Sequence, residues 1–560
     1  MSDDARATAR AWIAPAVAAG AVFALALATA GRELPGAFWD DGVYLASARS
    51  LAAGDGYRFA HLPGAPAAVH FPPLWPALLA LALRVAPAWP ATMGWLAIIN
   101  PILLAATAAL AVRWATRHLG LRAPLAAIVA VCATATLPLL VIAHTLFSEP
   151  LFLALLFVTL LATERAATRG GVRFGVAAGL AAGATVLARS AGIALVPAVV
   201  IALVVARRRR AAAAAAAAAI ACITPWQLWS AAHAHELAPS LRGSYGPYLA
   251  WVLRLYRERG VGFAGTVAAQ NVVSLFRTTG IVLFPFVPFA ARPLLITLVI
   301  VVVAVGLIAA RRRLALAATF LAGYLLMVLP WPYAPERFLW AVWPLIALVA
   351  ARGAAECWHF ATNAAERLPV RAANGLCAAV LLVALGGHGW YTARGLARHW
   401  WDSAAVHNAE ALTPVAEWIR ANTAPRDVVA CDGEAWVYFA TGRTVVPVHS
   451  LSPDEYLAGT PLEQAASDLR ALIAENHPRW LVLSAAAGEL AAVPLLDGRE
   501  AGPGLRHVAD LPGGGAAFAV IWDRPNDGPS ELSSLDAGFP SGAGSGRPSP
   551  ESSPPNARAR

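Results

Sequence analysis

Residues 150–188 read PLFLALLFVTLLATERAATRGGVRFGVAAGLAAGATVLA, two apolar runs joined by a short segment rich in arginine. A bilayer crossing needs about 20 mostly apolar residues, and candidate spans of roughly that length start near residues 150 and 174. The joining segment, ERAATRGGVR (164–173), has the arginine content of the cytoplasmic loops of membrane proteins. The stretch therefore predicts a hairpin of two membrane-crossing helices that turns in the cytoplasm.

The same pattern extends over most of the chain. With 58% hydrophobic and 14% charged residues, 560 residues cannot form a water-soluble globule. The run FPPLWPALLALALRV (71–85) is interpreted as a helix at the membrane surface, because a full crossing there would invert the later arginine loops. We therefore expect about eleven spans, starting near residues 11, 94, 124, 150, 174, 191, 211, 293, 314, 338 and 373.

The arginines also predict which loops share a side. The basic loops at 113–122, 164–173, 207–210, 311–313 and 352–371 are expected in the cytoplasm. Five polar segments then face outward: FWDDGVYLASARS (38–50), HTLFSEP (144–150), RSAG (189–192), HAHELAPSLRGSYGPY (233–248) and YAPERF (333–338). Because the net charge of +10 lies in short loop clusters, no nucleic-acid partner is expected. The prediction is a multi-pass protein of a bacterial-type cytoplasmic membrane.

After about residue 392 the composition becomes that of a soluble α/β unit. Helix-like stretches at 414–422 and 462–476 alternate with strand-like stretches at 427–431, 479–484 and 517–523. An odd number of spans with the N-terminus inside places this unit outside. We expect a transmembrane module (1–391), an extracytoplasmic α/β domain (392–525) and a disordered tail rich in Pro, Ser and Gly (526–560).

Six short segments carry a resemblance to a known family: WDDGVYLASARSLAAGDGY, HFPPLWP, HTLFSEPLF, LARSAG, PERFLWAVWP and VYFATGR. In order and spacing they resemble the polyprenol-phosphate-sugar-dependent membrane glycosyltransferases of family 39, relatives of protein O-mannosyltransferases and lipid A aminoarabinose transferases. The resemblance implies the C-superfamily fold, with eleven to thirteen spans and surface helices in the first outer loop. It also implies transfer of a hexosyl or pentosyl group from a polyprenyl-phosphate donor at the outer face. The acceptor, whether lipid, cell-envelope glycan or protein, stays open.

Such a transfer needs a base for the acceptor's proton, as in inverting glycoside chemistry. By position in the family motif, Asp40 is the predicted base or metal ligand, and Asp41 supports it. Glu149 in SEP matches the family's second acidic position. The alternatives are that Asp40 caps a surface helix starting near Gly42, and that Glu149 only favours the N-terminus of its helix.

Arg189 and Arg337 lie on the expected outer side, against the positive-inside bias that explains the basic loops. A guanidinium binds phosphate oxygens in a bidentate fork, and a departing phosphate needs cations around it. Arg337 and Arg189 are therefore the predicted ligands of the donor phosphate. The alternative is an ordinary ion pair, for Arg337 with its neighbour Glu336.

Tyrosines and one histidine are further candidates for substrate contacts. Outer tyrosines can line a sugar site, although they more often form an aromatic belt at the membrane interface. His70 stands near where the aminoarabinose transferases carry an acidic residue, and a histidine can bind a metal or phosphate. The tyrosines concerned are Tyr44, Tyr245, Tyr248 and Tyr333.

His233 and His235 belong to the outer segment HAHE. Their spacing is short enough for a shared metal ion, although residues two apart point different ways on a helix. The alternative is a solvated loop. A divalent metal ion thus stays an open possibility, and no other cofactor is indicated.

Two other functions compete with the transferase. A transporter or flippase of lipid-linked substrates would place charges near the bilayer midplane and show related halves, whereas here the charges crowd the outer side. A catalytically inactive partner protein is the other alternative, and the intact Asp40, Asp41 and Glu149 count against it. The VYFATGR segment (437–443) suggests that the exported domain belongs to the same protein, for acceptor recognition or for structural support.

Overall fold

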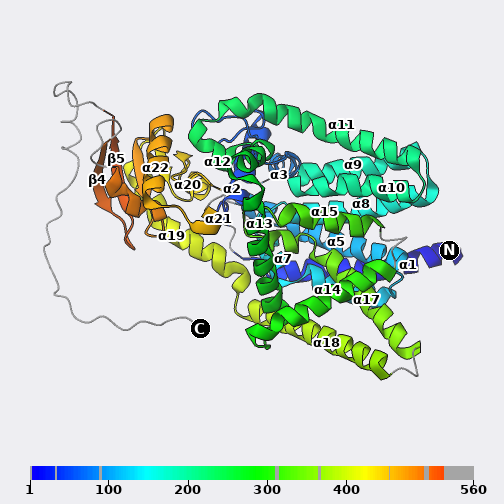
Figure 1. Ribbon diagram of the computed structural model, residues 1–560. Helices are drawn as coiled ribbons and strands as arrows, with labels where there is room; N and C mark the ends of the chain where they lie inside the picture. The colour runs from blue at the N-terminus through cyan, green and yellow to red at the C-terminus, as the bar shows by residue number, and fades with distance from the viewer. Residues whose placement is uncertain are drawn as a thin grey trace, which may run out of the picture.

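The computed structural model describes residues 3–31, 34–86, 91–309, 315–363, 368–452, 455–496 and 504–522. A bundle of long helices makes up most of the molecule, and a smaller unit built on a β-sheet lies at one end of it (Figure 1). Residues 526–560, the predicted tail, lie outside the described part of the chain.

The bundle follows the apolar runs of the sequence. Helices α8, α9 and α11 pack side by side, as do α1, α5 and α6 (Figure 1). Their bounds and those of the other bundle helices are α1 Asp3–Ala28, α2 Asp40–Ala53, α3 Leu74–Leu83, α4 Thr92–Ala97, α5 Ile99–Trp114, α6 Ala123–Thr134, α7 Leu137–His144, α8 Glu149–Arg169, α9 Val172–Ala188, α10 Leu195–Val205, α11 Arg209–His233, α12 Arg242–Tyr245, α13 Tyr248–Leu283, α14 Arg292–Ala309, α15 Ala315–Val328, α16 Glu336–Trp340, α17 Trp343–Asn363 and α18 Leu368–Ala397. Short helical turns η1 to η5 span Ala115–Leu119, Ser190–Ala194, Ala234–Glu236, Pro239–Leu241 and Phe289–Ala291.

Six helices of the described chain are long and apolar enough to cross a membrane, or seven if the bent pair α6 and α7 forms one span. The chain is therefore a multi-pass membrane protein. Helices occur at all the expected span positions, but α9, α10 with η2, and α15 are shorter, so the count of eleven stays a prediction. Helix α3 has 10 residues, about 15 Å, which is too short for a crossing, and it packs against α2.

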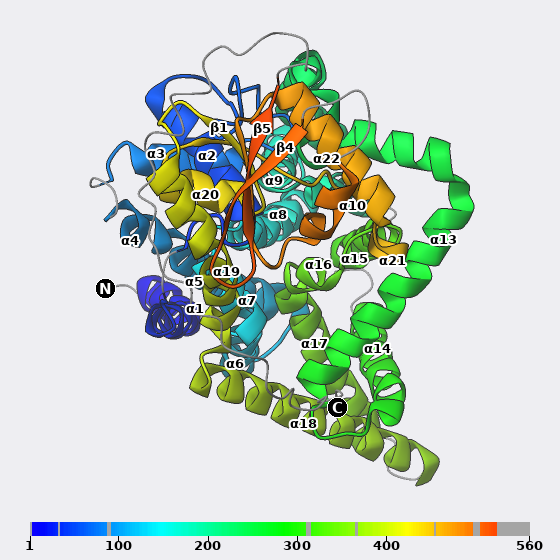
Figure 2. The same cartoon turned by 90° about the vertical axis from the view of Figure 1, so that its left-hand side faces the viewer.

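One part of the bundle differs from the simple alternation of loops and spans. Helix α13 has 36 residues with a break at Gly260, where φ is 70° and ψ is 179°. It runs along one edge of the molecule (Figure 2). Arg292, which interrupts the apolar stretch near 279–310 in the sequence, opens α14 and donates from Nε to the carbonyl of Val287 at 2.9 Å.

Helix α18 passes residue 391 and leads into α19, so the expected domain boundary falls inside a helix. The sheet unit, which we define as residues 400–522, holds five strands in the order β2-β1-β3-β5-β4; β4 and β5 lie side by side in Figure 2. Strand β1 is parallel to β2 and β3, whereas β5 is antiparallel to β3 and β4. Its elements are α19 Trp400–Asn422, β1 Val428–Cys431, α20 Glu434–Thr441, β2 Thr444–Val446, α21 Glu455–Ala458, α22 Leu462–Asn476, β3 Trp480–Leu483, η6 Gly488–Leu495, β4 Gly504–Asp510 and β5 Ala516–Ile521.

Apolar residues from α19 and the central strands form the core of the sheet unit. Val415 and Ile419 of α19 are fully buried against Val429 of β1 and Val482 of β3. Helix α20 lies between this sheet and the bundle, where it packs against α2. The sheet unit therefore touches the element that opens with Asp40.

Candidate active site

Four charged side chains from four separate segments meet at one end of α8 and α9. Arg337 of α16 donates from Nη1 to Oδ2 of Asp40 at 2.6 Å and from Nε to Oε1 of Glu149 at 2.5 Å. Nη1 of Arg189, the residue after α9, lies 2.7 Å from the same Glu149 oxygen. We call Asp40, Glu149, Arg189 and Arg337 the charge cluster. Segments up to 297 residues apart in the chain thus supply one site.

The cluster is largely withdrawn from solvent. The side chain of Glu149 is 0% exposed and that of Arg189 12%, while Asp40 and Arg337 form the more open rim. Buried charges are stable only when paired and hydrogen-bonded, and here two carboxylates balance two guanidinium groups. The ion-pair alternative named the wrong partner for Arg337, because Glu336 instead accepts hydrogen bonds from Ser274 and Thr278.

Three buried polar atoms of the cluster have no hydrogen-bond partner among the described residues: Oε2 of Glu149, Nε of Arg189 and Nη2 of Arg337. Such atoms are rare, and a ligand or ion often explains them. The ring of Phe147 lies 3.8 Å from the Arg337 guanidinium carbon, and that of Phe338 lies 5.1 Å from the Arg189 one. The two phenyl rings and the Glu149 carboxylate thus hold the two guanidinium groups in place. One N–H donor of each, Nε of Arg189 and Nη2 of Arg337, has no acceptor among the described residues.

Asp40 follows a strained turn. Trp39 has φ 67° and ψ −66°, and the Asp40 N–H donates to the carbonyl of Phe38 at 2.8 Å. These are the features of the rare γ-turn with positive φ, a conformation that costs about 1–3 kcal/mol and persists only when its surroundings enforce it. Helix α2 has no side-chain cap at its start, so the capping interpretation of Asp40 is wrong.

Asp41 is one of the groups that enforce this turn. Its two carboxylate oxygens accept the backbone N–H groups of Gly36 at 2.7 Å and Phe38 at 3.1 Å. The side chain is buried, and this burial raises the pKa of the carboxyl to about 6. Asp41 therefore faces the loop rather than the charge cluster, and its geometry favours the supporting role.

Glu434 is a residue of this region that the sequence motifs did not single out. It opens α20, and its Oε1 atom accepts the indole N–H of Trp39 and the hydroxyl of Tyr245, each at 2.6 Å. His61 lies 3.0 Å from the same Tyr245 hydroxyl. Burial raises the pKa of the Glu434 carboxyl. A carboxyl group from the sheet unit thus holds the residue just before Asp40.

Two glycines allow α20 to approach this closely. A Cβ atom on Gly42 would lie 2.6 Å from Cβ of Ala435, and one on Gly36 would lie 2.5 Å from the backbone nitrogen of Trp436. Gly36 also has φ +88°, which favours glycine. The sequence signal for this contact is only the pair of glycines around FWDD and an acidic residue three positions before VYFATGR.

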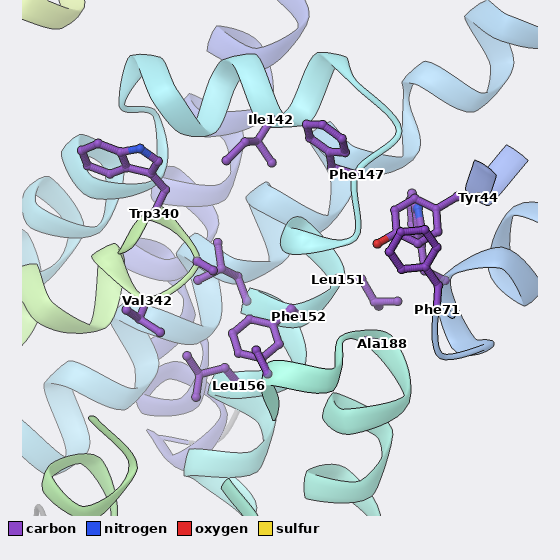
Figure 3. Close-up of a cluster of buried hydrophobic side chains, with 14 of the residues drawn as sticks. Tyr44, Phe71, Ile142, Phe147, Leu151, Phe152, Leu156, Ala188, Trp340 and Val342 are labelled. Atoms are coloured by element: carbon purple, nitrogen blue, oxygen red, sulfur yellow. The ribbon is translucent and has the colours of Figure 1, made fainter. Parts of the chain in front are cut away.

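Tyr44 and His70 lie beside the cluster in an apolar layer. The Tyr44 hydroxyl is 3.2 Å from Oγ of Ser148, and its ring centroid lies 4.4 Å from that of Phe71 (Figure 3). Nδ1 of His70 donates to the carbonyl of Gly246 at 2.7 Å, and burial lowers the pKa of its imidazole to about 4. Tyr44 is therefore buried beside the site rather than exposed in an interfacial belt, and His70 is a neutral side chain.

The remaining predicted tyrosines are close to this layer. The ring of Tyr248 is tilted against that of His70 with centroids 4.1 Å apart, and the ring centroid of Tyr333 lies 5.6 Å from that of Trp251. Tyr245 binds Glu434 as described. Tyr245 ends α12, Tyr248 opens α13, and Tyr333 precedes α16.

The two histidines of HAHE have separate surroundings. His233 stacks on Trp229 with centroids 3.8 Å apart, whereas His235 is exposed. Glu236 accepts the N–H of Ala67 at 3.0 Å and pairs with Arg58 at 3.4 Å. None of these contacts reaches the charge cluster, and the described residues contain no group of three or more His, Cys, Asp or Glu side chains arranged to hold a metal ion.

These observations define the class of the protein: it is a multi-pass helical membrane protein with the charge cluster as its candidate site. No protein-family model and no curated protein matches the sequence. Among solved structures, the chain is similar to ArnT, a lipid A aminoarabinose transferase, from Cupriavidus metallidurans. The match to ArnT bound to undecaprenyl phosphate has 16% identity and a TM-score of 0.44 and covers 89% of this chain and 97% of that one. The match to ArnT in the apo state has 15% identity and a TM-score of 0.47, and it covers 91% of this chain and 98% of that one.

The chain is also similar to the apo oligosaccharyltransferase of Archaeoglobus fulgidus, with 14% identity and a TM-score of 0.45 over 92% of this chain and 75% of that one. Because the identities are low and the TM-scores lie below 0.5, the proposal below rests on the geometry of the site.

Proposed function

We propose that this protein is a membrane glycosyltransferase that moves a sugar from a polyprenyl-phosphate carrier to a lipid, glycan or protein acceptor. The observation that carries the proposal is the charge cluster itself. It combines a carboxylate at the rim with two arginines, and the buried Nε of Arg189 and Nη2 of Arg337 have no hydrogen-bond partner in the part of the chain that the structure describes. A base and phosphate-binding cations are what displacement of a sugar phosphate requires.

In the proposed mechanism Asp40 accepts the proton of the acceptor hydroxyl. Its Oδ2 atom is paired with Arg337, and no hydrogen bond within the described residues engages Oδ1, which is the atom that takes the proton. The acceptor oxygen then bonds to the anomeric carbon while the bond from this carbon to the phosphate oxygen breaks. The electron pair of that bond leaves with the polyprenyl phosphate.

Arg337 and Arg189 are proposed to bind the phosphate as this charge develops. Glu149 touches both guanidinium groups, so we assign it the role of holding them in place. The ring of Phe147, 3.8 Å from the Arg337 guanidinium carbon, belongs with Leu151 to a cluster of buried apolar side chains (Figure 3), where a low dielectric strengthens each charge interaction. We further propose that Tyr44 and His70 line the sugar site.

The proposed arrangement in the membrane follows the arginine loops. With the N-terminus inside and eleven spans, the charge cluster and the sheet unit face the extracytoplasmic side of a bacterial-type cytoplasmic membrane. In this proposal residues 1–391 form the transferase module and residues 392–525 an external domain. No observation favours a transporter, since the cluster residues Glu149 and Arg189 stand at the ends of α8 and α9 rather than at their midpoints.

The test is transfer of radiolabelled sugar from a panel of polyprenyl-phosphate sugars into membranes that contain the protein. We expect incorporation with the wild type and loss with Asp40→Asn at matched protein levels. Asp55→Asn is the matched control, because Asp55 is an exposed aspartate just beyond the same helix. Equal incorporation by wild type and Asp40→Asn would show that Asp40 is not the base. No incorporation with any donor of a broad panel would contradict the proposed function.

A further inference from the structure

A second group of arginines lies at the opposite end of α8 and α9 from the charge cluster. Arg165 and Arg169 stand in the last turns of α8, and Arg173 in the first turn of α9. Together with Arg113 and Arg117 they line a cavity of about 820 Å³. We call this the arginine cavity.

The arginine cavity is separate from the charge cluster. Helix α8 has 21 residues and begins at Glu149, so at about 1.5 Å per residue the two sites are about 30 Å apart. That distance is the thickness of the hydrocarbon core of a bilayer. The two sites therefore belong to opposite borders of the membrane.

Three guanidinium groups of the cavity converge on a single aromatic ring. The guanidinium carbons of Arg173, Arg165 and Arg169 lie 4.7, 5.4 and 5.8 Å from the centroid of Phe174. Within the described chain no carboxylate forms an ion pair with any of the three, and the carboxylate of Glu164 lies 3.8 Å from His118. Cations gathered this closely repel one another, and an anion between them would offset the repulsion.

The conformation of the loop between α8 and α9 is stabilised by a different arginine. Arg208 donates hydrogen bonds from Nε to the carbonyl of Ala167 and from Nη2 to the carbonyl of Thr168, both at 2.9 Å, and so holds the end of α8. The positive-inside rule explains why arginines gather in the loops on the cytoplasmic side of a membrane. It does not explain why several of them line the same cavity. The convergence of Arg165, Arg169 and Arg173 is therefore a separate feature.

The inner wall of the cavity is apolar. Leu161 and Ala162 of α8 and Ala177 of α9 line it on the side toward the middle of the two helices. A ligand here would meet guanidinium groups at the membrane border and hydrocarbon just below them. We propose that the arginine cavity binds the phosphate headgroup of an anionic membrane phospholipid, with its acyl chains along α8 and α9. Guanidinium groups suit phosphate by charge and by bidentate geometry.

The test compares two triple variants in nanodiscs of phosphatidylcholine, alone or mixed with phosphatidylglycerol. Arg165→Gln, Arg169→Gln, Arg173→Gln removes the convergent charges. Arg207→Gln, Arg209→Gln, Arg210→Gln, which we call the loop variant, removes the same charge from the exposed α10–α11 loop and the first residues of α11, outside the cavity lining, and keeps Arg208. The readouts are the Tm of the protein and the phosphatidylglycerol that stays bound after extraction into detergent, measured by mass spectrometry.

We expect phosphatidylglycerol to raise the Tm of the wild type and of the loop variant, and not that of the cavity variant. Each basic residue near an anionic headgroup favours binding about fivefold, so bound phosphatidylglycerol should fall by about tenfold or more in the cavity variant alone. Equal losses in both variants would mean that only net charge matters and would overturn the proposal. An equal Tm rise with inorganic phosphate in phosphatidylcholine would overturn the lipid assignment. If the cavity variant does not fold, Arg173→Gln alone takes its place, with Arg207→Gln as its control and an expected loss of bound phosphatidylglycerol of about fivefold.

Discussion

At the scale of single residues, Glu149 is the carboxylate on which both buried guanidinium groups depend. Removing one partner of a buried ion pair typically costs about 3–5 kcal/mol, because the other charge is left uncompensated. We expect Glu149→Gln to lower the free energy of unfolding by about 3 kcal/mol, since Arg337 keeps its pair with Asp40. Glu149→Gln combined with Arg189→Gln should cost clearly less than the sum of the two single changes. Thermal unfolding of the four proteins measures this coupling, and strictly additive losses would contradict it.

Asp41 gives a prediction about pH. Burial raises the pKa of its carboxyl from 3.8 to about 6, so the folded protein holds this proton more tightly than the unfolded chain does. The resulting stabilisation is full below pH 4 and is lost as the pH rises to about 6. We expect the wild type to lose Tm relative to Asp41→Asn as the pH rises from 4 to about 7, and the difference to be constant above that range. A flat difference from pH 4 to 7 would show that Asp41 is ionised throughout.

At the scale of elements, the contact between α20 and the start of α2 is predicted to position the base. Glu434 holds the Trp39 indole, and misplacing a reacting group by about 1 Å can lower a rate about 100-fold. We expect Glu434→Ala to lower kcat for sugar transfer about 10- to 100-fold with little change in KM for the donor, because both arginines remain. Glu434→Gln should retain more activity, since its amide oxygen still accepts a hydrogen bond. The exposed Glu417→Gln of α19 is the control, and a rise in donor KM with unchanged kcat would contradict the positioning role.

The elements also show what the sequence could predict. Strands β1, β3 and β5 coincide with the apolar runs at 427–431, 479–484 and 517–523, because continuous apolar segments mark buried strands. Strand β2 has only three residues, and β4 is a mostly exposed edge strand with Arg506 and His507, so neither shows that pattern. The topology of the arginine loops predicted that the four residues of the charge cluster share one side, and the family resemblance singled out Asp40 and Glu149 among the residues there. Glu434 could not, because its role depends on tertiary contact between α20 and α2 and has no local signature.

At the scale of the whole molecule, the two ends of the α8–α9 hairpin have different chemistry. The charge cluster balances two carboxylates with two guanidinium groups at one end of α8, while the arginine cavity gathers positive charge at the other. Helix α20 packs on α2 near the cluster, so the sheet unit must share the cluster's side of the membrane. The orientation of every part is thus fixed once the side of one part is known.

This orientation is tested with single cysteines introduced into a chain whose five native cysteines have been replaced. Asp55→Cys lies beside the cluster end of the bundle, Asp510→Cys lies in β4, and Arg207→Cys lies in the loop between α10 and α11; all three positions are exposed. Because arginine-rich loops stay in the cytoplasm, we expect an impermeant maleimide to label the first two in intact spheroplasts and Arg207→Cys only after permeabilisation. Labelling of Arg207→Cys alone in intact spheroplasts would invert the proposed topology. Labelling of Asp55→Cys without Asp510→Cys would instead separate the sheet unit from the cluster, in conflict with the packing of α20 on α2.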